Sequence, residues 1–162
     1  MSPQDSKTVE ISGKREENNK INETQYLSFE IGKEKYALKL IENKEVIEPP
    51  PITKVPNTKK YVSGVINLRG QIVPVINLEK KLDITSNDAQ RKRIIVVEIK
   101  NSLVGILVDD VEDVVNIHQD NIEEITENKG GINQKFIDGV FSYENNLVII
   151  INIKDILFGD EK

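Results

Sequence analysis

The sequence predicts an all-β protein built from two small, similar lobes, with helices only as short connectors and at the C-terminal end. The chain contains 24 Ile and 16 Val but only two Ala, and β-branched side chains favour strands over helices. Segments such as 26–31 alternate apolar and polar residues with a period of two, which is typical of a strand with one buried face. Two internal repeats, in the same order along the chain, indicate that one lobe is a duplicate of the other.

Apolar segments separated by turn residues predict the strands in chain order. They are 25–31, 36–41, 46–47, 61–68 and 71–78 in the first half, and 94–99, 102–108, 111–117, 136–143 and 147–153 in the second half. The polar segment 119–128 and the end of the chain at 154–159 are the helical candidates. Residues 1–24 carry nine charged side chains and predict a flexible N-terminal tail, with a short strand around Val9–Ile11 as the alternative.

Proline and glycine mark the breaks between these strands. Pro49–Pro51 lack backbone donors and fix φ, so they are expected in a loop or at an edge after the third strand. Gly70 supplies the positive φ of a tight turn after Arg69, which makes 61–68 and 71–78 a hairpin. Pro74 lies inside the second arm of this hairpin and predicts either an edge strand or a bulge.

The repeats define the domain organisation. Residues 61–82 align with 136–157, and residues 30–47 align with 98–115. We therefore expect one domain at 25–158, with subdomain 1 at about 25–88 and subdomain 2 at about 89–158, and with strands possibly exchanged between them. Lobes of this size bury little surface alone, so the two are expected to pack together.

The residues that enzymes and metal sites require are scarce. The chain has no cysteine and one histidine, His118, which is expected to be a surface or strand-end residue rather than a ligand or base. The acidic group of Asp109, Asp110, Glu112 and Asp113 lacks the spacing of a calcium loop and predicts a solvated strand end. We therefore expect no catalysis, no metal and no cofactor.

Charge and hydropathy argue against two further classes, nucleic-acid binders and membrane proteins. A net charge of −5 with a pI near 5.1 and few aromatic residues argues against a nucleic-acid binder. The longest apolar run is 147–151, far short of the roughly 20 residues of a spanning helix, and the N-terminus lacks a secretory signal. These features predict a cytoplasmic protein without membrane insertion.

Arg69 is the candidate recognition residue. It is one of four arginines, against 18 lysines, and it lies inside a strongly apolar segment. The aligned residue in the second repeat is Glu144, so the turn tolerates either charge. A guanidinium that the fold does not need is suited to recognition of a partner.

The segments LSFEIGKEKYAL, VPN…YVSGVINLRGQIVPVINL and VGILVDDVEDVV resemble the chemotaxis coupling-protein family, CheW, from about Gln25 to Leu157. The resemblance implies two packed, SH3-like five-stranded β-barrel subdomains. It also implies a non-enzymatic adaptor that joins the cytoplasmic tips of chemoreceptors to the regulatory domain of the histidine kinase CheA.

The resemblance also implies the partner-binding residues. Asn67, Arg69 and Gly70 of the NLRG turn are expected to contact the receptor or the kinase. An apolar surface between the lobes, at Val46 and Ile47, is expected to receive the receptor's helical hairpin. The second lobe, around Val114 and Val115, is expected to face the kinase. The family often has an apolar residue at the position of Asn43, so this chain departs from the pattern there.

Two alternatives stay open at this point. A regulatory CheW-like module of a kinase or of a coupling–receiver protein would have the same fold. A small-barrel protein that binds nucleic acid or a ligand belongs to a different class and fits the acidic composition less well.

Overall fold

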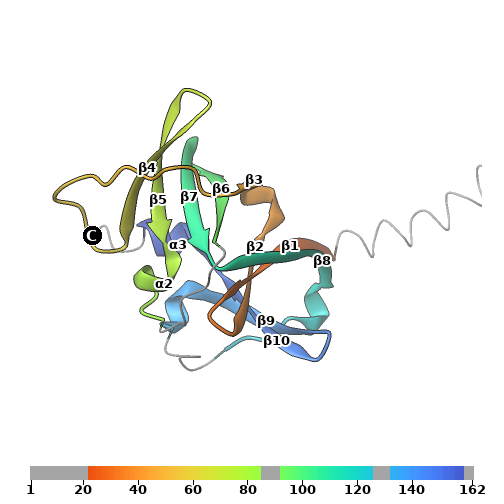
Figure 1. The fold of residues 1–162 in the computed structure, drawn as a ribbon. Helices are drawn as coiled ribbons and strands as arrows, with labels where there is room; N and C mark the ends of the chain where they lie inside the picture. Colours follow the sequence, from red (N-terminus) through yellow and green to blue (C-terminus); the bar gives the residue numbers. More distant parts are fainter. Residues whose placement is uncertain (1–21, 85–91, 126–131, 159–162) are drawn as a thin grey trace, which may run out of the picture.

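The computed structural model describes residues 22–84, 92–125 and 132–158, and shows two packed five-stranded sheets with short helices (Figure 1). The strands are β1 Glu23–Ile31, β2 Glu34–Lys39, β3 Asn43–Ile47, β4 Val62–Leu68, β5 Gln71–Asn77, β6 Arg93–Ile99, β7 Ser102–Val108, β8 Asp110–His118, β9 Ile137–Tyr143 and β10 Asn146–Ile151. The helices are α2 Leu78–Lys81 and α3 Ile153–Phe158, and the 3-10 turns are η1 Leu40–Glu42, η2 Gln119–Asn121 and η3 Gln134–Phe136. The predicted all-β fold with short helices is confirmed.

The two halves of the chain exchange strands. One sheet, here called barrel A, has the order β8-β1-β2-β10-β9, and the other, barrel B, has the order β3-β6-β7-β5-β4. The first hairpin of each half therefore pairs with the last three strands of the other half. A split of the chain near residue 88 does not separate the two barrels, because each barrel contains strands from both sides of that point.

The internal repeat corresponds to a structural repeat. Each strand of barrel A has its aligned counterpart at the same place in barrel B, and each barrel has one parallel pairing, β2 with β10 and β5 with β7. The capping is repeated too: the side-chain oxygen of Asn77 accepts from the backbone N–H of Lys80 at 3.1 Å, and that of Asn152 accepts from Asp155 at 3.0 Å. The duplication inferred from the sequence thus extends to the local hydrogen bonding.

The hydrophobic core has three parts. Tyr26, Ala37, Phe141 and others fill barrel A, while Ile66, Val73, Ile94 and others fill barrel B. The largest cluster lies between the barrels and takes side chains from both sheets, from α2 and from α3. Most of the apolar burial is therefore shared between the barrels, which agrees with the expectation that such small lobes pack together.

Strand β1 differs from the prediction of one buried face. Tyr26 points into barrel A, whereas Leu27 and Phe29 belong to the core between the barrels, and all three side chains are at most 4% exposed. A strand in the middle of a sheet that has a core on each side has no solvent face. In barrel B, Val65 is partly exposed, and the next residue, Ile66, is buried.

Pro74 does not lie on an edge strand, because β5 is placed between β7 and β4. Its cross-strand partner on β4 is Val65, whose N–H and carbonyl both bond the backbone of Thr53, at 2.8 and 2.9 Å. The pairing of β5 with β7 starts one residue later, at Val75. Neither neighbour needs an N–H from position 74, so proline is tolerated inside the sheet.

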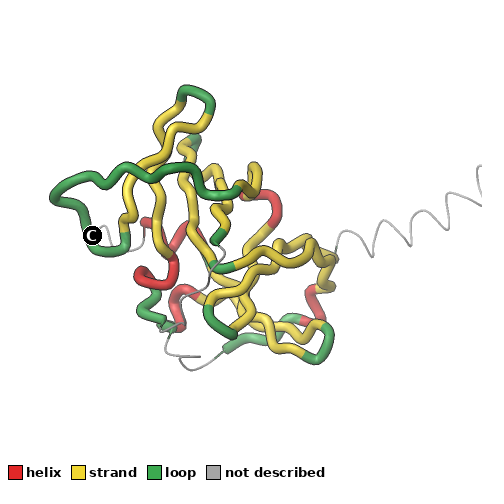
Figure 2. The backbone as a smooth tube through the Cα atoms, in the orientation of Figure 1, coloured by secondary structure: helices red, strands yellow, loops and turns green. Residues whose placement is uncertain are grey.

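The connection between β3 and β4 crosses over the strands of barrel B (Figure 2). It contains Pro49–Pro51, as predicted, and its Thr53 bridges to Val65. Gly64 makes this close approach possible: a Cβ at this position would overlap the Thr53 carbonyl and lie 2.9 Å from the Ile52 side chain, and its φ is +144°. Gly139 takes the same role in barrel A, with a φ of +158°.

Asp109 connects the two barrels and does not lie at a solvated strand end as predicted. Its carboxylate accepts from the backbone N–H of Gly32, in the β1–β2 turn of barrel A, at 2.6 Å. The same carboxylate accepts from the Lys92 ammonium, just before β6 of barrel B, at 2.6 Å. The Asp109 residue is 4% exposed, so the side chain is the buried anion of a link between the barrels. Asp110, Glu112 and Asp113 are exposed, as predicted.

We predict that Gly64→Ala costs about 3 kcal/mol of folding stability, because the new methyl group meets the backbone of Thr53 and the positive φ is strained. Gly70→Ala is the matched control: its φ is +87° but nothing lies within 4 Å of an added Cβ. Urea unfolding of both variants measures the difference. An equal loss in both would show that the close approach to Thr53 contributes nothing.

We predict that Asp109→Ala costs about 3 kcal/mol, since it leaves the Lys92 ammonium and the Gly32 N–H without their buried acceptor. Asp110→Ala is the control, because within the described residues that exposed carboxylate accepts only from the next backbone N–H, Val111, at 2.9 Å. Thermal unfolding monitored by circular dichroism separates the two. Equal melting temperatures would contradict the proposed link.

Candidate functional site

Exposed apolar side chains give the first indication of a functional surface. Among the described residues the large ones are Ile41 at 88%, Ile72 at 63%, Val114 at 52%, Leu147 at 43%, Val55 at 39% and Val46 at 38% exposed. Four of them form two pairs of repeat-aligned residues, Val46 with Val114 and Ile72 with Leu147. A fold has no need to keep an apolar residue in solvent twice, so these repeated positions are the candidate contact surface of each barrel.

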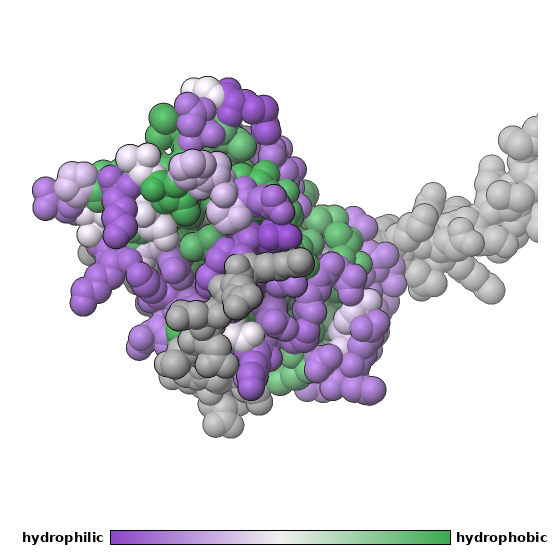
Figure 3. Space-filling model, in the orientation of Figure 1, coloured by the Kyte–Doolittle hydropathy of each residue, from purple (hydrophilic) through white to green (hydrophobic). Residues whose placement is uncertain are grey.

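The exposed leucine and isoleucine lie at equivalent hairpin tips. The β4–β5 turn and the β9–β10 turn have the same left-handed backbone at their first residue, with φ of 51° at Arg69 and 49° at Glu144. Figure 3 shows apolar surface on the β4–β5 hairpin at the top of the view. The two tips therefore share one backbone shape but present opposite charges beside an exposed apolar residue.

Arg69 is exposed and forms a two-pronged ion pair with Glu45 of β3. Its Nη1 donates to Glu45 Oε1 at 3.2 Å and its Nη2 donates to Oε2. This guanidinium lowers the pKa of the Glu45 carboxyl, and the carboxylate in turn raises the pKa of Arg69. The pair holds the hairpin tip against the edge strand of barrel B and leaves 70% of the Arg69 side chain accessible.

The other residues of the NLRG turn shape this tip. The side-chain oxygen of Asn67 accepts from the backbone N–H of Gly70 at 2.8 Å. Gly70 has a φ of +87°, which closes the two-residue turn. Asn67 and Gly70 therefore contribute to this surface by fixing the position of Arg69.

The four predicted apolar contact residues have different environments. Val46 and Val114 are exposed, on β3 and β8 respectively. Ile47 is partly buried against the interior of barrel B, and Val115 is 4% exposed inside barrel A. Of these four residues, only Val46 and Val114 therefore expose their side chains to solvent.

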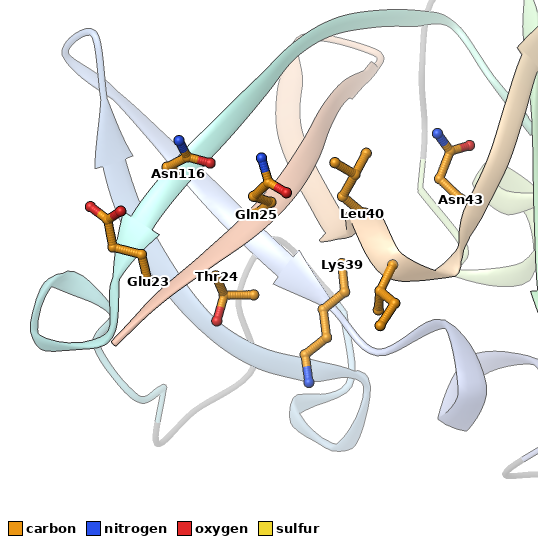
Figure 4. Close-up of a pocket in the computed structure, with 8 residues that line it drawn as sticks. Glu23, Thr24, Gln25, Lys39, Leu40, Asn43 and Asn116 are labelled. Carbon is orange, nitrogen blue, oxygen red and sulfur yellow. The ribbon is translucent and has the colours of Figure 1, made fainter. Parts of the chain in front are cut away.

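A groove lies where the two barrels meet. It has a volume of about 830 Å³ and is lined by Glu23, Thr24, Gln25, Lys39, Leu40, Ile41, Asn43 and Asn116 (Figure 4). These residues come from the start of β1, from β8, and from η1 with its flanks, where the chain passes from barrel A to barrel B. Ile41, the most exposed large apolar residue described, lies in this lining.

Sequence reasoning missed Ile41, Ile72, Leu147 and Glu45. Ile72 and Leu147 could have been found, because the repeat aligns them and the alternation of the hairpin places both on the outer face. The sequence pattern places Ile41 at the end of a strand, but β2 ends two residues earlier, at Lys39. The alternation of apolar and polar residues therefore could not predict that Ile41 is exposed. Glu45 is far from Arg69 in sequence, and only the fold brings them together.

Two titratable groups near these surfaces have shifted pKa values. Burial raises the pKa of Glu42, in η1 beside the groove. Hydrogen bonds to Glu112 and Glu30, at 2.5 and 3.1 Å, raise the pKa of Lys35 on β2.

His118 ends β8 as predicted, and its Nδ1 accepts from the backbone N–H of Asp120 at 3.1 Å. In the described parts of the chain, no three acidic or histidine side chains gather as a metal site would require, and no helix is long and apolar enough to span a membrane.

The fold and these surfaces define the class: a protein of two SH3-like β-barrels. A family model described as the CheW-like domain matches residues 25–160. The chain therefore belongs to the CheW family, as its sequence motifs indicated.

The relatives match this chain over most of their length, and a solved structure has the same fold. Chemotaxis protein CheW of Thermotoga maritima is 37% identical, over 85% of this chain and 89% of the relative. Chemotaxis protein CheW of Helicobacter pylori is 30% identical, over 95% and 92%. The crystal structure of the scaffolding protein TtCheW from Thermoanaerobacter tengcongensis is similar with a TM-score of 0.79 at 32% identity, over 86% of this chain and 90% of that one.

We predict that Arg69→Gln raises the pKa of Glu45 toward its ordinary value. In the folded protein this pKa is lowered, so the pair contributes stability above the unfolded pKa and loses it as the pH falls through the folded pKa. An NMR titration of the Glu45 carboxyl measures the shift. Arg93→Gln is the control, since that guanidinium lies 3.9 Å from a different carboxylate, Glu48. An unchanged Glu45 titration in Arg69→Gln would contradict the pairing in solution.

Proposed function

We propose that this protein is a non-enzymatic adaptor that couples the cytoplasmic tips of chemoreceptors to the histidine kinase CheA in signalling arrays. The observation that carries the proposal is the duplicated exposed apolar surface, with Val46 on barrel B and Val114 on barrel A. The names of the relatives support it, because they are chemotaxis proteins and one solved structure is titled a scaffolding protein. In this proposal the protein works in the cytoplasm.

The groove at the junction of the barrels suits an α-helix. It offers apolar surface from Leu40 and Ile41 and polar groups along its sides, which fits an amphipathic helix with a mixed face. The receptor tip, a helical hairpin, is the proposed occupant. Val46 is exposed on β3, three residues after Asn43 of the groove lining, and extends the apolar contact along barrel B.

The kinase domain is the proposed partner of barrel A. Val114 is the exposed apolar residue of β8, and the regulatory domain of CheA has the same fold as this chain according to the family resemblance. Arg69, held by Glu45, would orient a partner at the hairpin tip of barrel B, because a guanidinium gives directed hydrogen bonds. Small surfaces of this kind give transient contacts, and repetition of the contacts in an array supplies the remaining affinity.

We predict that Val114→Glu weakens binding of the CheA regulatory domain about tenfold and leaves receptor binding unchanged, and that Val46→Glu does the reverse. An added carboxylate prevents desolvation of the apolar contact, and tenfold corresponds to about 1.4 kcal/mol. Titration calorimetry with each purified partner measures both affinities.

Val55→Glu is the matched control, because Val55 is exposed to nearly the same extent as Val46 but lies in the β3–β4 loop outside both repeated segments. Circular dichroism verifies that each variant is folded. The proposal fails if the unaltered protein binds neither partner, and the assignment of surfaces fails if all three variants bind both partners equally well.

A further inference from the structure

Asn43 carries an unsatisfied polar atom. Within the described residues, its side-chain oxygen is the one buried side-chain nitrogen or oxygen atom that lacks a hydrogen-bond partner. A buried acceptor without a donor loses its bonds to water and gains none in return, so it lowers the stability of the folded state. The fold itself does not require this residue, because Asn43 is the first residue of β3 and its cross-strand partner is the buried Val97. A valine would suit that position better.

The two ends of this amide have different surroundings. Asn43 lines the groove as a partly exposed residue, although its oxygen is covered. Figure 4 shows the amide nitrogen on the side of Leu40 and Gln25, and the oxygen turned away from them. The groove therefore receives the donor end of the amide.

The rest of the polar lining is neutral or balanced in charge. Gln25 and Asn116 are cross-strand partners of β1 and β8, and both carry amides. The only ionised groups in the lining are Glu23 and Lys39, which have opposite signs. A carboxylate brought into this groove would be desolvated without a net positive environment, whereas an uncharged acceptor loses less hydration.

We propose that Asn43 is a specificity-determining residue of the groove, whose side-chain N–H donates to an uncharged acceptor, an amide or hydroxyl oxygen, on the partner helix. The residue lowers the stability of the free protein and contributes binding energy in the complex. This inference rests on the proposed docking of a receptor helix in the groove and names the chemistry of the helix face that enters it.

Two substitutions at this position test the inference. Asn43→Val removes the unsatisfied oxygen and the donor together, so the melting temperature rises by about 3 °C or more and binding of a soluble receptor-tip fragment weakens about tenfold. Asn43→Asp keeps the shape but replaces the donor with a second oxygen, so binding also weakens, while the melting temperature does not rise. Differential scanning calorimetry and titration calorimetry supply the two readouts.

Asn116→Val is the matched control for stability, because it makes the same change at an exposed groove amide with no buried orphan atom, and it leaves the melting temperature unchanged. The inference is overturned if Asn43→Val melts no higher than the unaltered protein, or if it binds the tip fragment as tightly. If the unaltered protein does not bind the fragment at all, the proposed function fails and the inference fails with it. If the unaltered protein and Asn43→Val both bind the fragment normally, the inference about Asn43 is overturned and the proposed function is not.

Discussion

The exchange of strands between the two halves is the constraint on which the rest of the structure depends. Because β1 and β2 pair with strands from the second half, and β6 and β7 with strands from the first, neither barrel can form from one half of the chain. The central strands consequently have a core on each face, and the largest apolar cluster lies between the barrels. Asp109 adds a polar link at the same junction, since it accepts from Gly32 and from Lys92. The relative position of the barrels is therefore fixed by the covalent and hydrogen-bonded path of the chain, and not by side-chain packing alone.

A fixed junction gives the protein its functional geometry. The groove takes its walls from β1 and β8 of barrel A and from η1, where the chain crosses to barrel B. Surfaces on opposite barrels, at Val46 and Val114, are then held at a constant separation. For an adaptor this rigidity matters more than the strength of either contact, because the productive arrangement of two partners depends on how their binding sites are oriented.

Periodicity and duplication were sufficient to predict the strands, the two-lobed architecture and the hairpin at Arg69. They predicted the surroundings of the strands less well, because the path of the chain decides which faces and edges are covered. The pattern predicts one buried face for β1 and an edge strand or a bulge at Pro74. The single buried face and the edge position are wrong for the same reason, since β8 and β10, which flank β1 and β2, and β7, which pairs with β5, lie in the other half of the chain. The candidate site follows the same division. Arg69 stands out by composition, and Val46 and Val114 by the family resemblance, but the Arg69–Glu45 pair and the exposure of Ile41 require the tertiary structure.

Comparison of the repeats separates what the fold needs from what a partner needs. Gly64 and Gly139 are kept because a loop backbone passes against each of them, and Asn77 and Asn152 because each caps a short helix. No such reason applies to Ile72 and Leu147, which are exposed in both barrels, and beside them Arg69 and Glu144 share a backbone conformation but differ in charge. A duplicated gene can keep an exposed apolar residue twice while its charged neighbour diverges if both copies bind proteins and the two partners differ. Under the proposed function, the pair of tips, equal in shape and opposite in charge, is the result expected of one ancestral contact surface that came to serve two different partners.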